Sequence, residues 1–131
     1  MGKRRILIVD DDREQQQALG LRLRASGYET VFACDCIQAI AAARKTQPDL
    51  VLLDIGLPGG DGHLVLERLK SMTGICAIPV VVLSAKDPAG HRERAFQAGA
   101  VAYFQKPADN TELLASIRDA LGEPVQDSEV A

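Results

Sequence analysis

Four short runs of consecutive apolar residues limit, more than any other feature, what this chain can fold into. They cover residues 6–9, 50–53, 80–83 and 101–104, and a fifth, more polar run covers residues 28–33. Continuous apolar runs of this length are typical of strands that are covered on both faces, as in parallel sheets. Glu29 and Thr30 indicate that the second strand along the chain lies at an edge of its sheet.

In the segments between these runs, apolar residues recur at the spacing typical of helices. A strand followed by a helix, repeated five times, predicts an α/β fold. Because strand–helix–strand crossovers are right-handed, the helices should cover both faces of a doubly wound, five-stranded parallel sheet. The apolar helix positions that support this prediction include Leu19, Leu23, Leu114, Ile117 and Leu121.

Local signals mark several helix ends. Gly27 and Gly99 are expected to end the first and fourth helices, because glycine adopts the left-handed backbone conformation at little cost. Asp109 and Glu112 have the spacing of a capping box, which predicts that the last helix begins there.

The length and charge of the chain bound its organisation. Its 131 residues suffice for one domain and leave no room for a second. We expect this domain to span residues 1–121 and residues 122–131, which offer little to bury, to form a flexible tail or the start of a linker. A net charge of −3 argues against bulk binding of nucleic acid, which requires a basic face.

The sequence also favours a cytoplasmic protein that does not associate with a membrane. No apolar run approaches the length of a membrane span, and the N-terminus lacks the features of a signal peptide. Cys34, Cys36 and Cys76 do not form a zinc-binding pattern, and we expect them to be reduced and mostly buried.

Polar residues follow or end four of the predicted strands. They are Asp10 and Asp11, Asp54, Ser84 and Lys106. The carboxyl ends of parallel strands meet at one edge of the sheet, where open α/β sheets bind their ligands, so these side chains should lie close together. Adjacent carboxylates favour a hard divalent cation such as Mg²⁺, and a hydroxyl and an ammonium group suit phosphoryl oxygens.

Each of these residues also has an ordinary interpretation when it is taken alone. Asp10 and Asp11 could serve as helix caps, Asp54 could be a turn residue, Ser84 a strand-end cap and Lys106 a solvated side chain. Their joint occurrence at four strand ends, in this order, favours one site that accepts a phosphoryl group.

The motifs ILIVDDD, DLVLLDIGLPGGDG, VVVLSA and AYFQKP resemble those of the receiver domain of two-component response regulators. The resemblance covers about residues 4–121. It implies a flavodoxin-like fold with the strand order 2-1-3-4-5 and five helices. It also implies a function, namely that a histidine kinase or histidine phosphotransfer protein donates a phosphoryl group to this domain in a two-component phosphorelay.

The resemblance assigns a role to each residue of the site. Asp54 would accept the phosphoryl group. Asp11, Asp54 and the backbone carbonyl of Gly56 would coordinate Mg²⁺ directly, and Asp10 would act largely through water. Lys106 would contact the bound phosphoryl group. Such a domain promotes its own phosphorylation and dephosphorylation and is not a turnover enzyme on a small substrate.

The resemblance also implies a conformational switch. Ser84 would move to hydrogen-bond the phosphoryl group, and the ring of Tyr103 would turn inward as it does so. The Lys106–Pro107 peptide bond would be cis. The output face would comprise the fourth helix, the fifth strand and the fifth helix, which could bind a protein partner, a fused output domain or a second copy in a phosphorylation-linked dimer.

The chain departs from the usual family pattern at three positions of the site region. Glycine stands at positions 56 and 60, and Ala108 replaces a phenylalanine, which puts local packing in doubt. Our hypothesis is that Gly56 and Lys86 set the lifetime of the acyl phosphate by controlling the access of water. His63 and His91 are isolated in the sequence, and neither lies in a phosphodonor motif.

Three other readings of the chain remain open at this point. An aspartyl-phosphate phosphatase would require a second acid where Gly56 stands. A nucleotide or flavin domain would require a glycine-rich loop after the first strand, where this chain has three aspartates. The third alternative is a receiver-like module that binds its partners independently of phosphorylation.

Overall fold

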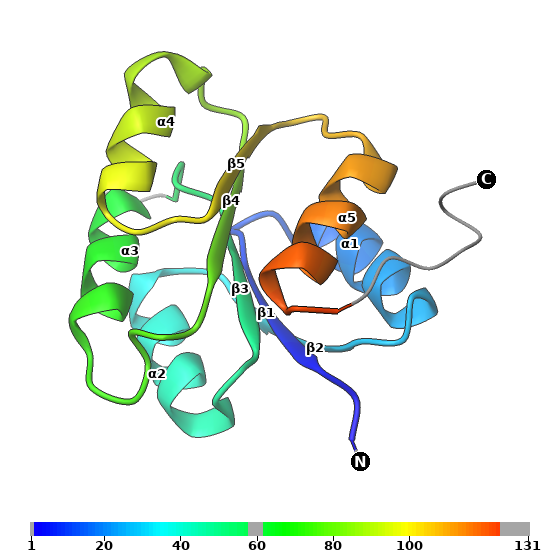
Figure 1. Ribbon diagram of the computed structural model, residues 1–131. Coiled ribbons are helices and arrows are strands. Elements are labelled where there is room, and N and C mark those ends of the chain that lie inside the picture. The colour runs from blue at the N-terminus through cyan, green and yellow to red at the C-terminus, as the bar shows by residue number, and fades with distance from the viewer. Residues whose placement is uncertain (1, 58–61, 124–131) are drawn as a thin grey trace.

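The computed structural model describes residues 2–57 and 62–123 and contains five strands and five helices in strict alternation (Figure 1). In chain order these elements are β1 (Arg5–Val9), α1 (Arg13–Ala25), β2 (Glu29–Ala33), α2 (Cys36–Thr46), β3 (Leu50–Leu53), α3 (Gly62–Ser71), β4 (Val80–Ser84), α4 (Pro88–Gln97), β5 (Ala102–Gln105) and α5 (Asn110–Ala120).

The strands form one parallel sheet in the order β2-β1-β3-β4-β5. The predicted fold class and strand order are therefore confirmed, as is the edge position of β2. As this order implies, β5 forms the opposite edge of the sheet. Its residues are less buried than the continuous apolar run indicated. Val101, which precedes β5, is 50% exposed.

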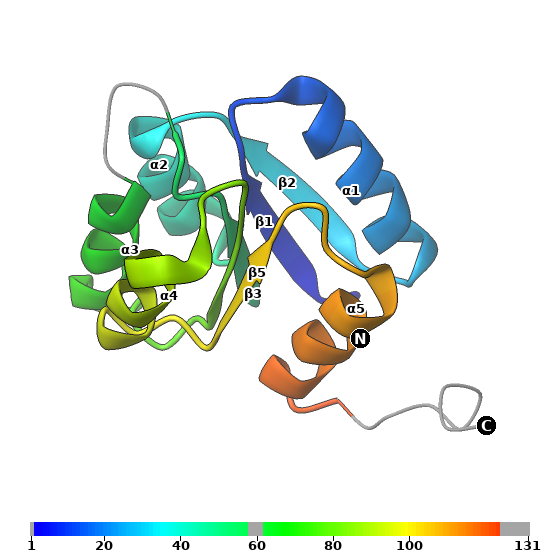
Figure 2. The same cartoon turned by 90° about the horizontal axis from the view of Figure 1, so that it is seen from above.

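Side chains of the central strands alternate between two hydrophobic cores, one on each face of the sheet. Leu7 and Val9 of β1 point to the core that α2, α3 and α4 cover. Ile6 and Ile8 point to the core beneath α1 and α5. Figures 1 and 2 show these helices as two layers on opposite sides of the sheet. The continuous apolar runs follow from this arrangement, since both faces of each central strand are buried.

The helix ends that the sequence signalled are largely as expected. Gly27 and Gly99 have φ angles of +96° and +108°, which glycine adopts without the steric cost of a side chain. The amide of Glu112 donates to the Asp109 carboxylate at 3.0 Å, which forms one half of the predicted capping box. At the start of α4 the backbone of Ala89 and Gly90 is not helical, and this kink was not predicted.

The C-terminal end of the described chain is attached to the domain. The Tyr28 hydroxyl donates to the Glu123 carboxylate at 2.7 Å, and the Glu123 amide donates to the Arg118 carbonyl at 2.8 Å. Burial and the Glu123 carboxylate raise the pKa of Tyr28 to about 12, so this hydroxyl remains a donor at neutral pH. The boundary at residue 121 stays a prediction, because most of the predicted tail lies outside the described residues.

The three cysteines are free, but the expectation that they are mostly buried is wrong. Cys34 and Cys36 are partly exposed and Cys76 is exposed, because they lie at or near the ends of elements rather than beneath the helices. Among the described residues, no helix is long and apolar enough to cross a membrane.

Candidate functional site

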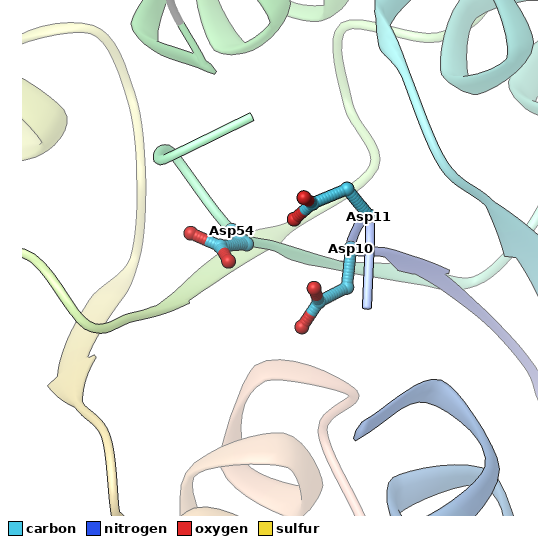
Figure 3. A group of neighbouring side chains, drawn as sticks. All are labelled: Asp10, Asp11 and Asp54. Atoms are coloured by element: carbon cyan, nitrogen blue, oxygen red, sulfur yellow. The ribbon is translucent and has the colours of Figure 1, made fainter. Parts of the chain in front are cut away.

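Three carboxylates meet at the carboxyl ends of β1 and β3, the two strands that are paired at the centre of the sheet (Figure 3). Asp10 and Asp11 follow β1, and Asp54 follows β3. Each offers an oxygen within 4.8 Å of the others. Asp10 and Asp54 are only 5% and 9% exposed, whereas Asp11 is exposed. Three anions at this spacing repel one another, so the cluster is suited to a cation.

Lys106 supplies one positive charge to this cluster from the end of β5. Its ammonium nitrogen lies 2.7 Å from Oδ2 of Asp10 and 3.2 Å from Oδ2 of Asp54. The Lys106–Pro107 peptide bond is cis, as predicted. Burial lowers the pKa of Lys106, but its hydrogen bond to Asp10 and the charges of Asp54 and Asp10 outweigh that effect and raise it. The lysine is therefore charged at neutral pH and leaves the three carboxylates only partly neutralised.

The Asp54 carboxylate is fixed by groups on both of its oxygens. Oδ1 accepts hydrogen bonds from the Ser84 hydroxyl at 2.9 Å and from the Gly56 amide at 2.8 Å. Oδ2 faces Lys106. Ser84 is fully buried at the end of β4, and its oxygen also accepts a hydrogen bond from the Lys86 amide at 3.2 Å. The structure thus brings Asp10, Asp11, Asp54, Ser84 and Lys106 together as expected from their strand ends.

Tyr103 contacts the loop that follows Ser84. Its hydroxyl donates to the Lys86 carbonyl at 2.9 Å. Burial, followed by the charges of Asp54 and Asp87, raises the pKa of Tyr103, so the hydroxyl is a donor at neutral pH. The predicted inward turn of this ring stays a prediction, but its hydrogen bond already connects β5 to the segment that carries Ser84.

Two residues that the sequence analysis did not single out support the carboxylates. The side-chain amide of Gln16, which is buried in α1, donates to the carbonyls of Asp10 at 2.6 Å and Ala33 at 2.9 Å. The backbone amide of Asp12 donates to Oδ1 of Asp10, and the Asp12 side chain caps α1. Asp12 therefore shapes the loop without joining the cluster. The sequence signal that could have identified Gln16 is its position on the inner side of a predicted helix, beside a strand end.

A groove between α1 and α5 opens beside the carboxylates. The residues that line it include Asp10, Lys106, Leu19, Ala108 and Leu113. Ala108 thus borders an open groove where the family usually has a phenylalanine. Ala108 is itself partly buried and packs against the core beneath α1 and α5.

The donor set fits a hard divalent cation. Carboxylate oxygens on three neighbouring side chains are the ligands that Mg²⁺ prefers, and the exposure of Asp11 leaves room for the waters that Mg²⁺ retains. Gly56 lies beside Asp54, but the role of its carbonyl as a ligand stays a prediction. Position 60 lies outside the described residues.

The fold and the site together define a doubly wound α/β domain with a carboxylate, hydroxyl and lysine site at the carboxyl edge of its sheet. The family model described as the response regulator receiver domain matches residues 6–118. The chain belongs to this family of two-component receiver domains. This assignment replaces the phosphatase and nucleotide-binding alternatives.

Individual relatives agree with the assignment. The chain is 38% identical over 117 residues to the DNA-binding dual master transcriptional regulator RpaA of Synechocystis. The matched region covers 89% of this chain and 48% of RpaA. It therefore spans about half the length of that relative. A response regulator structure from Chloroflexus aurantiacus superimposes with a TM-score of 0.86 at 31% identity, covering 92% of this chain and 99% of that one.

A further solved structure bears on the metal. The receiver domain of the sensor histidine kinase PA1611 from Pseudomonas aeruginosa was solved with a magnesium ion coordinated in its active-site cleft. It superimposes with a TM-score of 0.84 at 30% identity, covering 93% of this chain and all of that one.

Proposed function

We propose that Asp54 accepts a phosphoryl group from a phosphohistidine on a histidine kinase or histidine phosphotransfer protein, and that this reaction depends on Mg²⁺. The observation that carries the proposal is the position of Asp54, with Ser84 and the Gly56 amide on one oxygen, Lys106 on the other, and two further carboxylates within 4.8 Å.

The chemistry requires little beyond positioning and charge. An Asp54 oxygen attacks the phosphorus atom as the bond from phosphorus to the histidine nitrogen breaks, and the departing imidazole retains the bonding electrons and takes up a proton. Lys106 faces the oxygens of the transferring group and offsets their charge. Mg²⁺, held by Asp11, Asp54 and the Gly56 carbonyl with Asp10 acting through water, would neutralise the remaining charge.

The same contacts explain why phosphorylation would act as a switch. In the unphosphorylated site, the Ser84 hydroxyl donates to the oxygen of Asp54 at 2.9 Å. A phosphoryl group on Asp54 offers new acceptor oxygens farther from the backbone, so Ser84 would move toward them. That movement would displace Lys86, whose carbonyl accepts from Tyr103. The change would therefore reach α4, β5 and α5.

The comparison with RpaA bears on the partner of the output face. RpaA joins a similar domain to a DNA-binding function, but this chain matches only about half of RpaA. We place the domain in the cytoplasm, where a kinase could reach it, and assign its output to a protein partner, a fused domain or a phosphorylation-linked dimer.

Intact mass spectrometry tests the proposal directly. The protein would be incubated with Mg²⁺ and acetyl phosphate, alongside the Asp54→Asn variant and a control variant, Asp12→Asn, whose side chain lies outside the cluster. We expect a phosphate adduct in the wild type and in Asp12→Asn but none in Asp54→Asn. An adduct that persists in Asp54→Asn would refute the assignment of the acceptor. Mg²⁺ binding without any adduct would favour a module that acts independently of phosphorylation.

A further inference from the structure

His63 and His91, which are isolated in the sequence, lie against each other in the structure. His63 is the second residue of α3 and is 1% exposed, and His91 lies in α4 and is partly exposed. Nε2 of His63 is 3.0 Å from Nδ1 of His91. Their separation in the sequence gives no sign of this contact, because it depends on the packing of α3 against α4.

The contact is a directional hydrogen bond rather than a stack of rings. The planes differ by only 7°, but the ring centroids are 5.3 Å apart, which is the 3.0 Å nitrogen separation plus the two ring radii. The rings therefore lie end to end in nearly one plane, along the direction of the N–H group and the lone pair. One imidazole donates and the other accepts, so at least one of them must be neutral.

This bond joins the two segments that leave the phosphorylation site. The segment after Asp54 leads into α3, whose first amide, that of Gly62, donates to the Ile55 carbonyl at 3.1 Å. The start of α3 is thus attached to the residue that follows Asp54. The segment after Ser84 leads into α4, where the Asp87 carboxylate accepts from the Ala89 amide at 2.9 Å.

The start of α4 is also the least regular part of that helix. Ala89 and Gly90 have non-helical backbone angles, and the regular turns begin at His91. The bond to His63 therefore fixes α4 at the point where its regular part begins, immediately after a kink that could change shape.

We propose that His63 and His91 are positioning residues that favour the unphosphorylated arrangement of α4, an inference that rests on the proposed function. Movement of Ser84 toward a phosphoryl group shifts the segment that leads into α4. The start of α3 remains attached to Ile55, so the two imidazoles separate. A bond that is made in only one of two states stabilises that state, and it lowers the affinity for any ligand that binds the other state better.

Beryllofluoride, a tetrahedral analogue of the phosphoryl group, provides a stable probe. Its apparent affinity would be measured in the presence of Mg²⁺ for the wild type, His91→Leu and His91→Asn. Asparagine places a polar atom near the position of Nδ1 and retains the bond, whereas leucine removes it. We expect His91→Leu to bind the probe roughly fivefold more tightly, which corresponds to one ordinary hydrogen bond, and His91→Asn to match the wild type.

Urea unfolding would first establish that both variants fold, and His91→Ala would replace His91→Leu if the latter does not. The inference is overturned if the variant without the bond binds the probe no more tightly than the wild type, or if His91→Asn changes affinity by the same factor. If the wild type neither binds the probe nor acquires a phosphate adduct, the proposed function itself fails, and this inference fails with it.

Discussion

Removal of one carboxylate from the site should have opposite effects on stability with and without Mg²⁺. The variant is Asp11→Asn, which keeps the size of the side chain and removes its charge. Asp11 offers an oxygen within 4.8 Å of oxygens of both Asp10 and Asp54, while Lys106 contacts only those two. Without a metal ion, the main electrostatic effect on the Asp11 carboxylate is therefore repulsion by the carboxylates of Asp10 and Asp54.

The size of the effect follows from these distances. At an effective dielectric constant of about 20, two like charges at this separation repel by about 3.5 kcal/mol. Asp11 is exposed, and salt and water screen its charge, so we expect the metal-free variant to gain about 1 kcal/mol of unfolding free energy. The wild type should gain about 2.7 kcal/mol when Mg²⁺ is present at about 100 times its dissociation constant. The variant should lose most of that gain.

Urea unfolding in low salt, with EDTA or with Mg²⁺, measures both effects. The matched control is Asp12→Asn, because asparagine caps a helix as well as aspartate does and Asp12 lies outside the cluster. We expect Asp11→Asn to be the more stable protein in EDTA and the less stable one in Mg²⁺, while the control follows the wild type. A metal-free Asp11→Asn that is less stable than the wild type would show that the cluster is not electrostatically strained.

Three further outcomes are expected. Gly62→Ala should lose about 3 kcal/mol of unfolding free energy in urea, because a Cβ atom there would overlap the backbone of Ile55, which cannot rotate away; a loss below about 1 kcal/mol would contradict this. The pKa of Lys106 is raised from 10.5 in the folded protein. The contribution of its charge to stability should therefore be complete below pH 10.5 and disappear as the pH rises through the pKa of the folded state. The difference in unfolding free energy between wild type and Lys106→Met should shrink only in strong alkali. A Cβ at position 56 would lie 3.3 Å from Oδ1 of Asp54 and 3.6 Å from Cε of Lys86. Gly56→Met should therefore cover an acyl phosphate on Asp54 and slow its hydrolysis several-fold, and Lys86→Ala should change that rate as well. Unchanged decay of the adduct mass in both variants would refute the hypothesis that these two positions control the access of water.

The sequence predicted the parts of this structure that depend on strand ends. Asp10, Asp54, Ser84 and Lys106 could be placed together because parallel strands present their carboxyl ends at a common edge, whatever the details of the helices. The strand order itself came from resemblance to receiver domains, since alternation of strands and helices alone permits other orders.

The parts that could not be predicted depend on how side chains reach across helices. The pairing of His63 with His91 requires α3 and α4 to pack at one particular offset. The bridge from Gln16 to two carbonyls requires its side chain to reach the gap between β1 and β2. Neither distance is encoded in a local pattern of residues, so neither contact has a signal comparable to an apolar run.

The hydrogen bond from Tyr28 to Glu123 determines where the chain leaves the described domain. Tyr28 immediately precedes β2, so the bond lies at the amino edge of the sheet, whereas Asp54 lies at the carboxyl edge. A tag or protein joined beyond Glu123 is therefore tethered through Glu123 at the end of the sheet away from Asp54. Tension at that tether would act first on the Tyr28–Glu123 hydrogen bond at the start of β2 and not on the residues that contact Asp54.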